Sequence, residues 1–340
     1  MAVNQQGTGA AAPPHQPPIS DARADQLAVL LIFAGCVAGT LYAYVFGRTA
    51  WPTVEVVDPT PGNPFNTIAH ALLCALVYLW AIELYGRVAA LGAVGAAVAA
   101  PSLLAAAQYV PSDLGYAACY FGVVYAQARN ALDPSVQSVL VAAAAVAVAC
   151  ALGTPWQPLV AVVAAIPVVR VLAAEPGERR LRVVHGAVVA VLGSTLLGAG
   201  IAHLGAALWP AAAPAEPQAR GPGLGFLPPV GRLTPRIHTV VDVRHLPTLL
   251  LAFGPSWPWH RRYGDGVIAA AVVLGGLLFG FRDTGDATLL PVVPFVALLA
   301  GRAWDPHRSA AERRFATVFL LAQALIVLLT PHFVEPFLEP

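Results

Sequence analysis

Eleven apolar runs follow one another along this chain of 340 residues, and they constrain its fold more than any other feature. They lie at 26–47, 67–86, 88–109, 114–127, 136–153, 157–173, 183–209, 239–254, 266–281, 287–301 and 314–330. A helix needs roughly 20 apolar residues to cross a bilayer, so the shorter runs are expected to be tilted, half-length or re-entrant. Strands of a membrane barrel would alternate polar and apolar side chains, and these runs do not. The sequence predicts an all-α polytopic integral membrane protein with about 9–11 transmembrane helices.

The content of charged residues supports this class. Charged residues make up 11% of the chain and hydrophobic residues 58%, whereas a soluble domain has about 25% charged residues. A net charge of +1 leaves no basic excess to neutralise phosphates, so a nucleic-acid partner is not expected. The predicted partner is the lipid bilayer, and protein partners stay unknown.

The runs divide the chain into four regions. Residues 1–24, rich in Ala, Pro, Gln and Gly, are predicted to be a disordered tail. No basic segment precedes a short apolar core there, so no cleavable signal peptide is expected. Residues 25–209 form a first block of about seven transmembrane helices, 210–238 a Pro/Gly-rich extramembrane loop, and 239–334 a second block of about four helices.

The arginines predict the orientation of the helices. If all eleven runs cross and the N-terminus is inside, 13 arginines lie inside and 5 outside. Without a crossing at 239–254 the tally becomes 8 inside and 11 outside. Cytoplasmic loops carry the excess of arginine, so the bias favours a crossing at 239–254 and a cytoplasmic N-terminus. Merging or splitting one of the weaker runs, 114–127 or 157–173, would restore the bias in another way.

Polar side chains at the start of run 239–254 form the first candidate site. His238, Asp242 and His245 have the spacing i, i+4, i+7, which places them on one face of a helix. Such a stripe can bind a metal or relay protons, with the carboxylate tuning a histidine, and Arg244 can pair with a carboxylate elsewhere. The alternative is an interfacial entry segment with solvated charges. The sequence does not identify the metal or any cofactor.

His260, Arg261 and Arg262, flanked by tryptophans and a tyrosine, form the second candidate site. One interpretation is an aromatic belt with positive-inside arginines at a membrane surface. The other is a binding site for an anionic headgroup, because arginine can grip a phosphate through parallel hydrogen bonds.

Two groups of small residues are assigned packing roles. The sequence around Gly193, Ser194, Gly198 and Gly200 predicts close helix packing. The cysteines lie inside apolar runs without a C-x-x-C spacing, which indicates small buried hydrophobes rather than a zinc site or disulfides. These cysteines are Cys36, Cys74, Cys119 and Cys150.

Three classes of function fit these features. The first choice is a non-catalytic membrane or assembly component. The second is a membrane-embedded enzyme on a lipid or lipid-linked substrate, with His238, Asp242, Arg244 and His245 facing outward as the site. The third is a small-solute transporter, although the runs hold few of the ionisable residues that mark a transport pathway. Convergence of residues 238–245 with polar groups from other helices would favour the enzyme.

Overall fold

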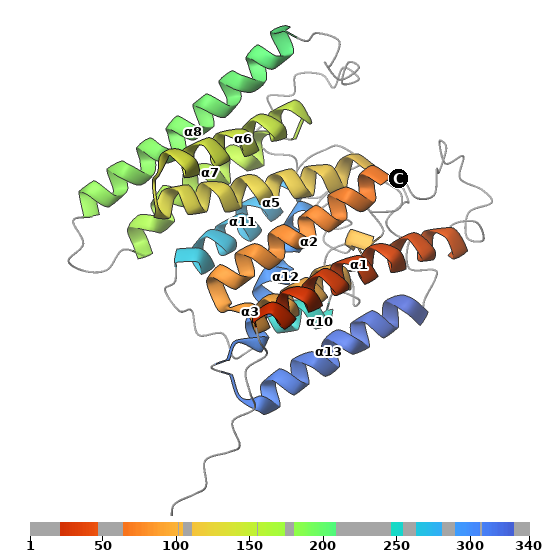
Figure 1. Cartoon of the computed structure of the whole chain (residues 1–340). Coiled ribbons are helices and arrows are strands. Elements are labelled where there is room, and N and C mark those ends of the chain that lie inside the picture. Colours follow the sequence, from red (N-terminus) through yellow and green to blue (C-terminus); the bar gives the residue numbers. More distant parts are fainter. Residues whose placement is uncertain are drawn as a thin grey trace, which may run out of the picture.

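The described part of the chain is helical throughout (Figure 1). This computed structural model describes residues 21–46, 64–100, 102–104, 111–154, 156–173, 180–208, 246–253, 263–280, 290–306 and 308–329. The helices in chain order are α1 (Asp21–Phe46), α2 (Pro64–Tyr85), α3 (Arg87–Val98), α5 (Pro111–Leu132), α6 (Val136–Ala151), α7 (Trp156–Ala173), α8 (Arg180–Leu208), α10 (Leu246–Phe253), α11 (Tyr263–Gly280), η3 (Leu290–Val292), α12 (Val293–Gly301), η4 (Arg302–Trp304) and α13 (Ala310–Leu329). Each α-helix overlaps one predicted apolar run, so the predicted all-α fold is confirmed.

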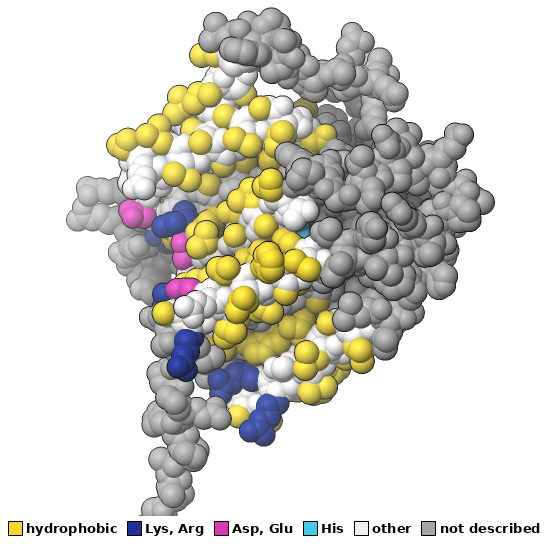
Figure 2. Space-filling view, turned by 45° about the vertical axis from the view of Figure 1, so that its right-hand side comes forward, with side chains coloured by type: hydrophobic (Ala, Val, Ile, Leu, Met, Phe, Trp, Pro, Cys, Tyr) yellow, Lys and Arg dark blue, Asp and Glu magenta, His cyan; other side chains and the backbone are white. Residues whose placement is uncertain are grey.

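The outer surface of the bundle is apolar. Figure 2 shows hydrophobic side chains over most of the described face, with charged side chains gathered along one edge. Three of the described helical segments are long and apolar enough to cross a membrane: Thr67–Tyr85, Trp156–Ala173 and His185–Gly205. Other described apolar helices are shorter, as the run lengths predicted: Arg87–Val98, Val136–Ala151, Tyr263–Leu278 and Leu290–Trp304. The protein is a multi-pass integral membrane protein.

Charged side chains of the described helices meet at one end of the bundle, here called the charged end. Asp25 at the start of α1 pairs with Arg87 at the start of α3, with N–O 3.4 Å. Glu83 at the end of α2 pairs with Arg129 near the end of α5, with N–O 3.3 Å. Since α2 and α5 end where α1 and α3 begin, α1 and α3 run antiparallel to α2 and α5. Arg87 and Arg129 therefore lie at the same end of the bundle, as the threading of the sequence predicted for these two arginines.

Helix α3 lies at the centre of one half of the bundle because its side chains are small. A Cβ on Gly92 would strike the indole of Trp304, and one on Gly95 would lie 2.8 Å from the Leu320 side chain. Gly301 of α12 approaches the α3 backbone in the same way. Small residues let helix backbones come close, which is the usual basis of tight packing in membranes. The Ala/Gly-rich sequence of α3 thus explains its contacts with α12, η4 and α13.

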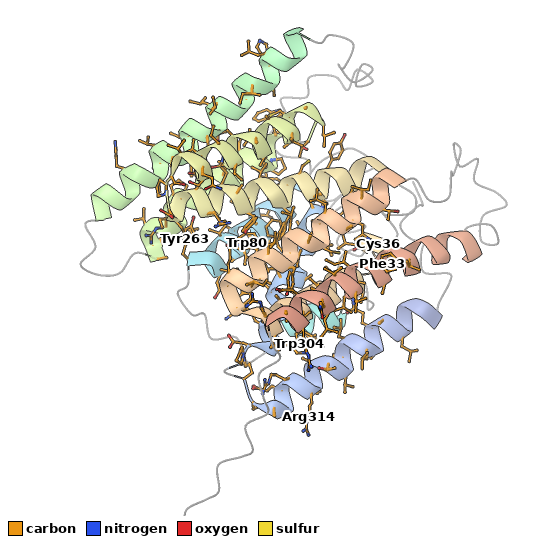
Figure 3. The ribbon with its side chains drawn as sticks, in the orientation of Figure 1. Phe33, Cys36, Trp80, Tyr263, Trp304 and Arg314 are labelled. Atoms are coloured by element: carbon orange, nitrogen blue, oxygen red, sulfur yellow. The ribbon has the colours of Figure 1, made fainter. Side chains whose placement is uncertain are left out.

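Aromatic rings fill the space where α2, α5 and α12 meet. Phe295 of α12 packs against Phe121 with ring centroids 4.8 Å apart and against Tyr120 at 5.6 Å. Trp80 of α2 meets Phe121 edge-on at 5.3 Å and lies among the helices in Figure 3. Edge-to-face and tilted ring pairs are favourable geometries, so this cluster holds the three helices together.

Candidate functional site

The two sites predicted from the sequence lie outside the described residues. This applies to His238, Asp242, Arg244 and His245, and to His260, Arg261 and Arg262. Their roles stay predictions. The chain becomes described immediately after each group, at Leu246 of α10 and at Tyr263 of α11, so the structure shows what these attachment points contact.

The first turn of α10 is anchored by a buried polar contact. The hydroxyl of Thr248 donates to Oε1 of Gln323 on α13 at 2.5 Å. The amide Nε2 of Gln323 donates to the carbonyl of Ala99, just past the end of α3, at 3.0 Å. Thr248 is 4% exposed and Gln323 1% exposed, so these hydrogen bonds lie inside the bundle. The helix that follows the first predicted site is therefore bonded to α13, which is itself bonded to the end of α3.

Helix α11 begins at the charged end. The hydroxyl of Tyr263 donates to the carbonyl of Ala128 on α5 at 3.2 Å. Two residues later, Asp265 accepts a 2.6 Å hydrogen bond from Tyr85 and lies 3.7 Å from Arg302. An acidic residue in the first turn also suits the positive end of the helix dipole. The second predicted site is thus joined to the bundle beside the last turns of α5.

A lateral groove lies between the described helices α2, α5 and α6. Its volume is about 660 Å³. Gly115 and Arg129, both on α5, mark its two ends, and 14 helical residues span about 21 Å. Small residues of α5 form its floor, because a short side chain leaves room between neighbouring helices. These floor residues are Gly115, Ala118, Gly122 and Ala126.

The walls of the groove are apolar over most of its length. Leu72 of α2 and Val141 and Val148 of α6 line it, and each is more than half exposed at the outer surface of the bundle. Leu76 and Leu152 continue the same lining. An apolar recess that opens on the hydrocarbon side of a membrane protein suits a lipid chain, which loses nothing by leaving the bulk lipid and gains packing contacts.

Polar side chains close the groove at the charged end. Arg129 lines it and is 60% exposed, with Nη1 3.3 Å from Glu83 Oε1. The hydroxyl of Tyr125 donates to the same Glu83 oxygen at 2.8 Å. Asp133, one turn beyond Arg129, and Ser138 of α6 also line this end. The groove therefore has one polar end and a long apolar body, the shape of a single lipid molecule.

The connection from α5 to α6 is fixed by hydrogen bonds. Ser135 caps α6: its hydroxyl oxygen accepts from the Ser138 amide at 3.1 Å, and the Ser138 hydroxyl oxygen accepts from the Ser135 amide at 2.8 Å. Such a reciprocal cap satisfies amides that the helix start would otherwise leave open. The single hydroxyl hydrogen of Ser138 has two acceptors within reach, the Asp133 carbonyl at 3.0 Å and Asn130 Oδ1 at 3.1 Å. The polar wall of the groove is consequently well ordered.

Buried amides behind the groove tie α5 to α8. Asn130 Nδ2 donates to the Ala190 carbonyl at 2.9 Å and to Ser194 Oγ at 3.2 Å. The Ser194 hydroxyl donates to Gln127 Oε1 at 2.9 Å. Gln127, Asn130 and Ser194 have no exposed surface. Inside a bilayer every buried polar group needs a partner, so this network fixes the position of α5 and hence of Arg129.

The fold is similar to that of ArnT. The crystal structure of ArnT from Cupriavidus metallidurans bound to undecaprenyl phosphate superposes with a TM-score of 0.52 and 15% sequence identity. The match covers 92% of this chain and 73% of ArnT. At this identity the likeness to ArnT shows the fold, a multi-pass helical membrane protein. No protein-family model and no curated protein matches the sequence.

The predicted cysteines differ in burial, and α2 also holds a buried histidine. Cys74 is buried in α2, in agreement with a small packed hydrophobe, whereas Cys150 is exposed on α6, and all four cysteines are free. His70 is 2% exposed, on the far half of α2. No group of three His, Cys, Asp or Glu residues suited to a metal occurs in the described ranges.

The polar end of the groove was missed in the sequence because its residues were assigned other roles. Arg129 counted only toward the orientation of the helices, Asp133 falls in a short break between apolar runs, and Ser138 lies near the start of the run 136–153. The spacing of the floor residues is the signal that could have indicated a recess, since positions 115, 118, 122 and 126 hold small residues on one helix face.

Proposed function

We propose that this protein is a membrane-embedded enzyme that acts on a lipid or lipid-linked substrate, whose apolar chain lies in the groove between α2, α5 and α6. The groove itself carries the proposal. It is open on the lipid-facing side, it is apolar along most of about 21 Å, and it ends among Arg129, Asp133 and Ser138. A solute pathway would instead need polar groups along its length.

The likeness to ArnT supports this proposal. ArnT was solved with undecaprenyl phosphate, which combines a long prenyl chain with a phosphate. A ligand of that general form, long and apolar with one polar end, suits the groove of this chain. The headgroup would lie at the charged end, where the arginine bias puts the cytoplasmic surface.

The two predicted sites lie at different distances from this headgroup. His238, Asp242, Arg244 and His245 keep their predicted acid-base or metal-binding role, but they directly precede α10, whose first turn lies about 18 Å along α3 from the charged end, so they are not assigned to the headgroup. His260, Arg261 and Arg262 are the proposed headgroup contacts. These last residues directly precede Tyr263, which bonds to α5 one residue before Arg129.

Lipid co-purification tests the groove. The chain purified in mild detergent is expected to carry a discrete lipid species detectable by native mass spectrometry. Leu72→Trp and Val148→Trp place an indole in the groove and should remove that species. Val189→Trp is the matched control, because Val189 is 56% exposed on α8 and lies outside the groove lining. Equal lipid retention in all three variants would contradict the proposal.

A second comparison separates an enzyme from a non-catalytic lipid-binding protein. If the bound lipid is a substrate, the wild type purified from cells should carry two related species of different mass, substrate and product. Leu72→Trp should carry neither, because its indole enters the groove. A single lipid species in the wild type would favour the non-catalytic membrane component.

A further inference from the structure

We infer that the polar end of the groove selects a zwitterionic aminophospholipid headgroup, in which a phosphate and an ammonium are joined by a short linker. This inference rests on the proposed function, because it names the class of lipid that the same groove takes. Three observations carry it: the free donors of Arg129, the unpaired carboxylate of Asp133, and the balance of charge between them.

Arg129 can hold the phosphate. Its guanidinium has five N–H donors in a planar fork, and one nitrogen, Nη1, faces Glu83. Tyr125 donates to the same Glu83 oxygen, so the carboxylate of Glu83 is satisfied from two sides and holds Arg129 in place. With 60% of its side chain exposed and lining the groove, the guanidinium offers its other nitrogens to a ligand. Arginine is well suited to paired hydrogen bonds with phosphate oxygens.

Asp133 can hold the ammonium. Within the described residues its carboxylate has no hydrogen bond and no ion pair, although it lines the groove. Its backbone is fixed at both ends: its amide donates to the Arg129 carbonyl at 3.0 Å, and its own carbonyl accepts from Ser138 at 3.0 Å. A carboxylate on an ordered backbone, without a cation of its own, is a complement for an amine that enters the groove.

The spacing of the two side chains matches such a headgroup. Arg129 and Asp133 are four residues apart at the end of α5, so their Cβ atoms are about 5–6 Å apart. They do not pair with each other, since the ion pair of Arg129 among the described residues is with Glu83. A phosphate against Arg129 and an ammonium against Asp133 would each meet its opposite charge.

The carboxylate of Asp133 disfavours a purely anionic headgroup. Glu83 is the partner of Arg129, so among the described side chains that line this end Asp133 is left as a negative charge without a cation. A phosphate without an amine would meet Arg129 but would also be repelled by the unpaired Asp133. A quaternary amine such as choline carries the charge but has no N–H to donate to the carboxylate. An ethanolamine-type headgroup satisfies both side chains.

Titration with three lipids of identical acyl chains tests the headgroup. Phosphatidylethanolamine, phosphatidylcholine and phosphatidylglycerol are added separately to the delipidated full-length chain, and bound lipid is counted by native mass spectrometry. We expect phosphatidylethanolamine to bind about tenfold more tightly than either of the others, the size of one charge-assisted hydrogen bond. Asp133→Asn should erase the preference for phosphatidylethanolamine over phosphatidylcholine. Arg129→Gln should weaken the binding of phosphatidylethanolamine and of phosphatidylcholine by about tenfold each.

Glu312→Gln is the control, because Glu312 is an exposed carboxylate on α13 outside the groove. This variant should bind the three lipids like the wild type. Tighter binding of phosphatidylglycerol, or an unchanged preference in Asp133→Asn, would overturn the inference. If Leu72→Trp abolishes binding of all three lipids while no headgroup is preferred, the groove proposal stands and the headgroup inference fails. If Leu72→Trp binds all three lipids like wild type, the groove proposal itself fails.

Discussion

Removal of Arg302 is expected to destabilise the bundle more than any loss of a surface charge, because its partner is buried. Arg302 Nη2 lies 3.7 Å from Asp265 Oδ2, and the two side chains are 12% and 5% exposed. At an effective dielectric of about 20, two unit charges at this distance attract by about 4.5 kcal/mol. Arg302→Gln would leave the Asp265 carboxylate buried without this compensation. We expect a loss of about 3–5 kcal/mol in the free energy of unfolding.

A matched ion pair on the surface provides the control. Arg308 and Glu312 also have an N–O distance of 3.7 Å, but their side chains are 21% and 48% exposed. Solvent screens such a pair, and i,i+4 pairs on helices contribute about 0.3–0.5 kcal/mol. Arg308→Gln should therefore cost several times less than Arg302→Gln, although the two distances are equal.

The thiol of Cys74 can report unfolding. Cys74 is 1% exposed on α2, so in a variant with the other three cysteines replaced by alanine it reacts only when the bundle opens. Each 1.4 kcal/mol changes an equilibrium about tenfold, so Arg302→Gln should raise the labelling rate by roughly 10²–10³-fold or more. The double variant Asp265→Asn/Arg302→Gln should recover most of this loss, because no isolated charge stays buried. Equal labelling rates for Arg302→Gln and Arg308→Gln would refute the reasoning.

Three further predictions concern packing, hydrogen bonding and pH. Gly198→Val should cost about 1–3 kcal/mol in the same labelling assay, because a Cβ there would strike the α6 backbone, whereas Gly200→Val has open space and should be neutral. Asn130→Leu removes two buried hydrogen bonds and should cost about 1–2 kcal/mol, checked by thermal unfolding in detergent. Ser309 and Glu312 cap the start of α13, because the Ser309 amide and hydroxyl donate to the Glu312 carboxylate and the Glu312 amide donates to Ser309. These hydrogen bonds hold the pKa of Glu312, which lies before the apolar run at 314–330, below its ordinary 4.5. That cap is present above pH 4.5 and is lost as pH falls through the lowered pKa, so amide exchange in the first turn of α13 should speed up in acid, and Glu312→Gln should remove this pH dependence.

The positions of the helices were predictable because hydrophobicity over a helix length is a local property of the sequence. The ends of the helices were less predictable. The run 88–109 predicted one long helix, but α3 ends at Val98, and Pro101 shortly afterwards cannot continue an α-helix. Within the run 239–254 the structure describes the helix Leu246–Phe253, and Pro247 lies at its described start.

The prediction of close helix packing holds only at the small residues that face a neighbouring helix. Gly198 and Ser194 do pack closely, against α6 and α5 respectively. The same prediction was wrong for Gly193 and Gly200, which face open space on the outside of α8. A sequence shows that a residue is small, but the side of the helix that meets another helix depends on segments far away in the chain. The groove was hidden for the same reason, since its walls come from α2 and α6 and its floor from α5.

The contacts of α10 bear on the path of the chain between the two blocks. Along α5, Gln127 and Asn130 bond to Ser194, and Asn130 also to the earlier Ala190, so α8 runs antiparallel to α5 and away from the charged end. Helix α11 begins at the charged end, so the segment between α8 and α11 must return there. Thr248 meets Gln323 where Gln323 bonds to Ala99, twelve residues past Arg87 and about 18 Å along α3. The first turn of α10 therefore lies about 18 Å from the charged end, and the crossing that the arginine bias predicts for 239–254 stays a prediction.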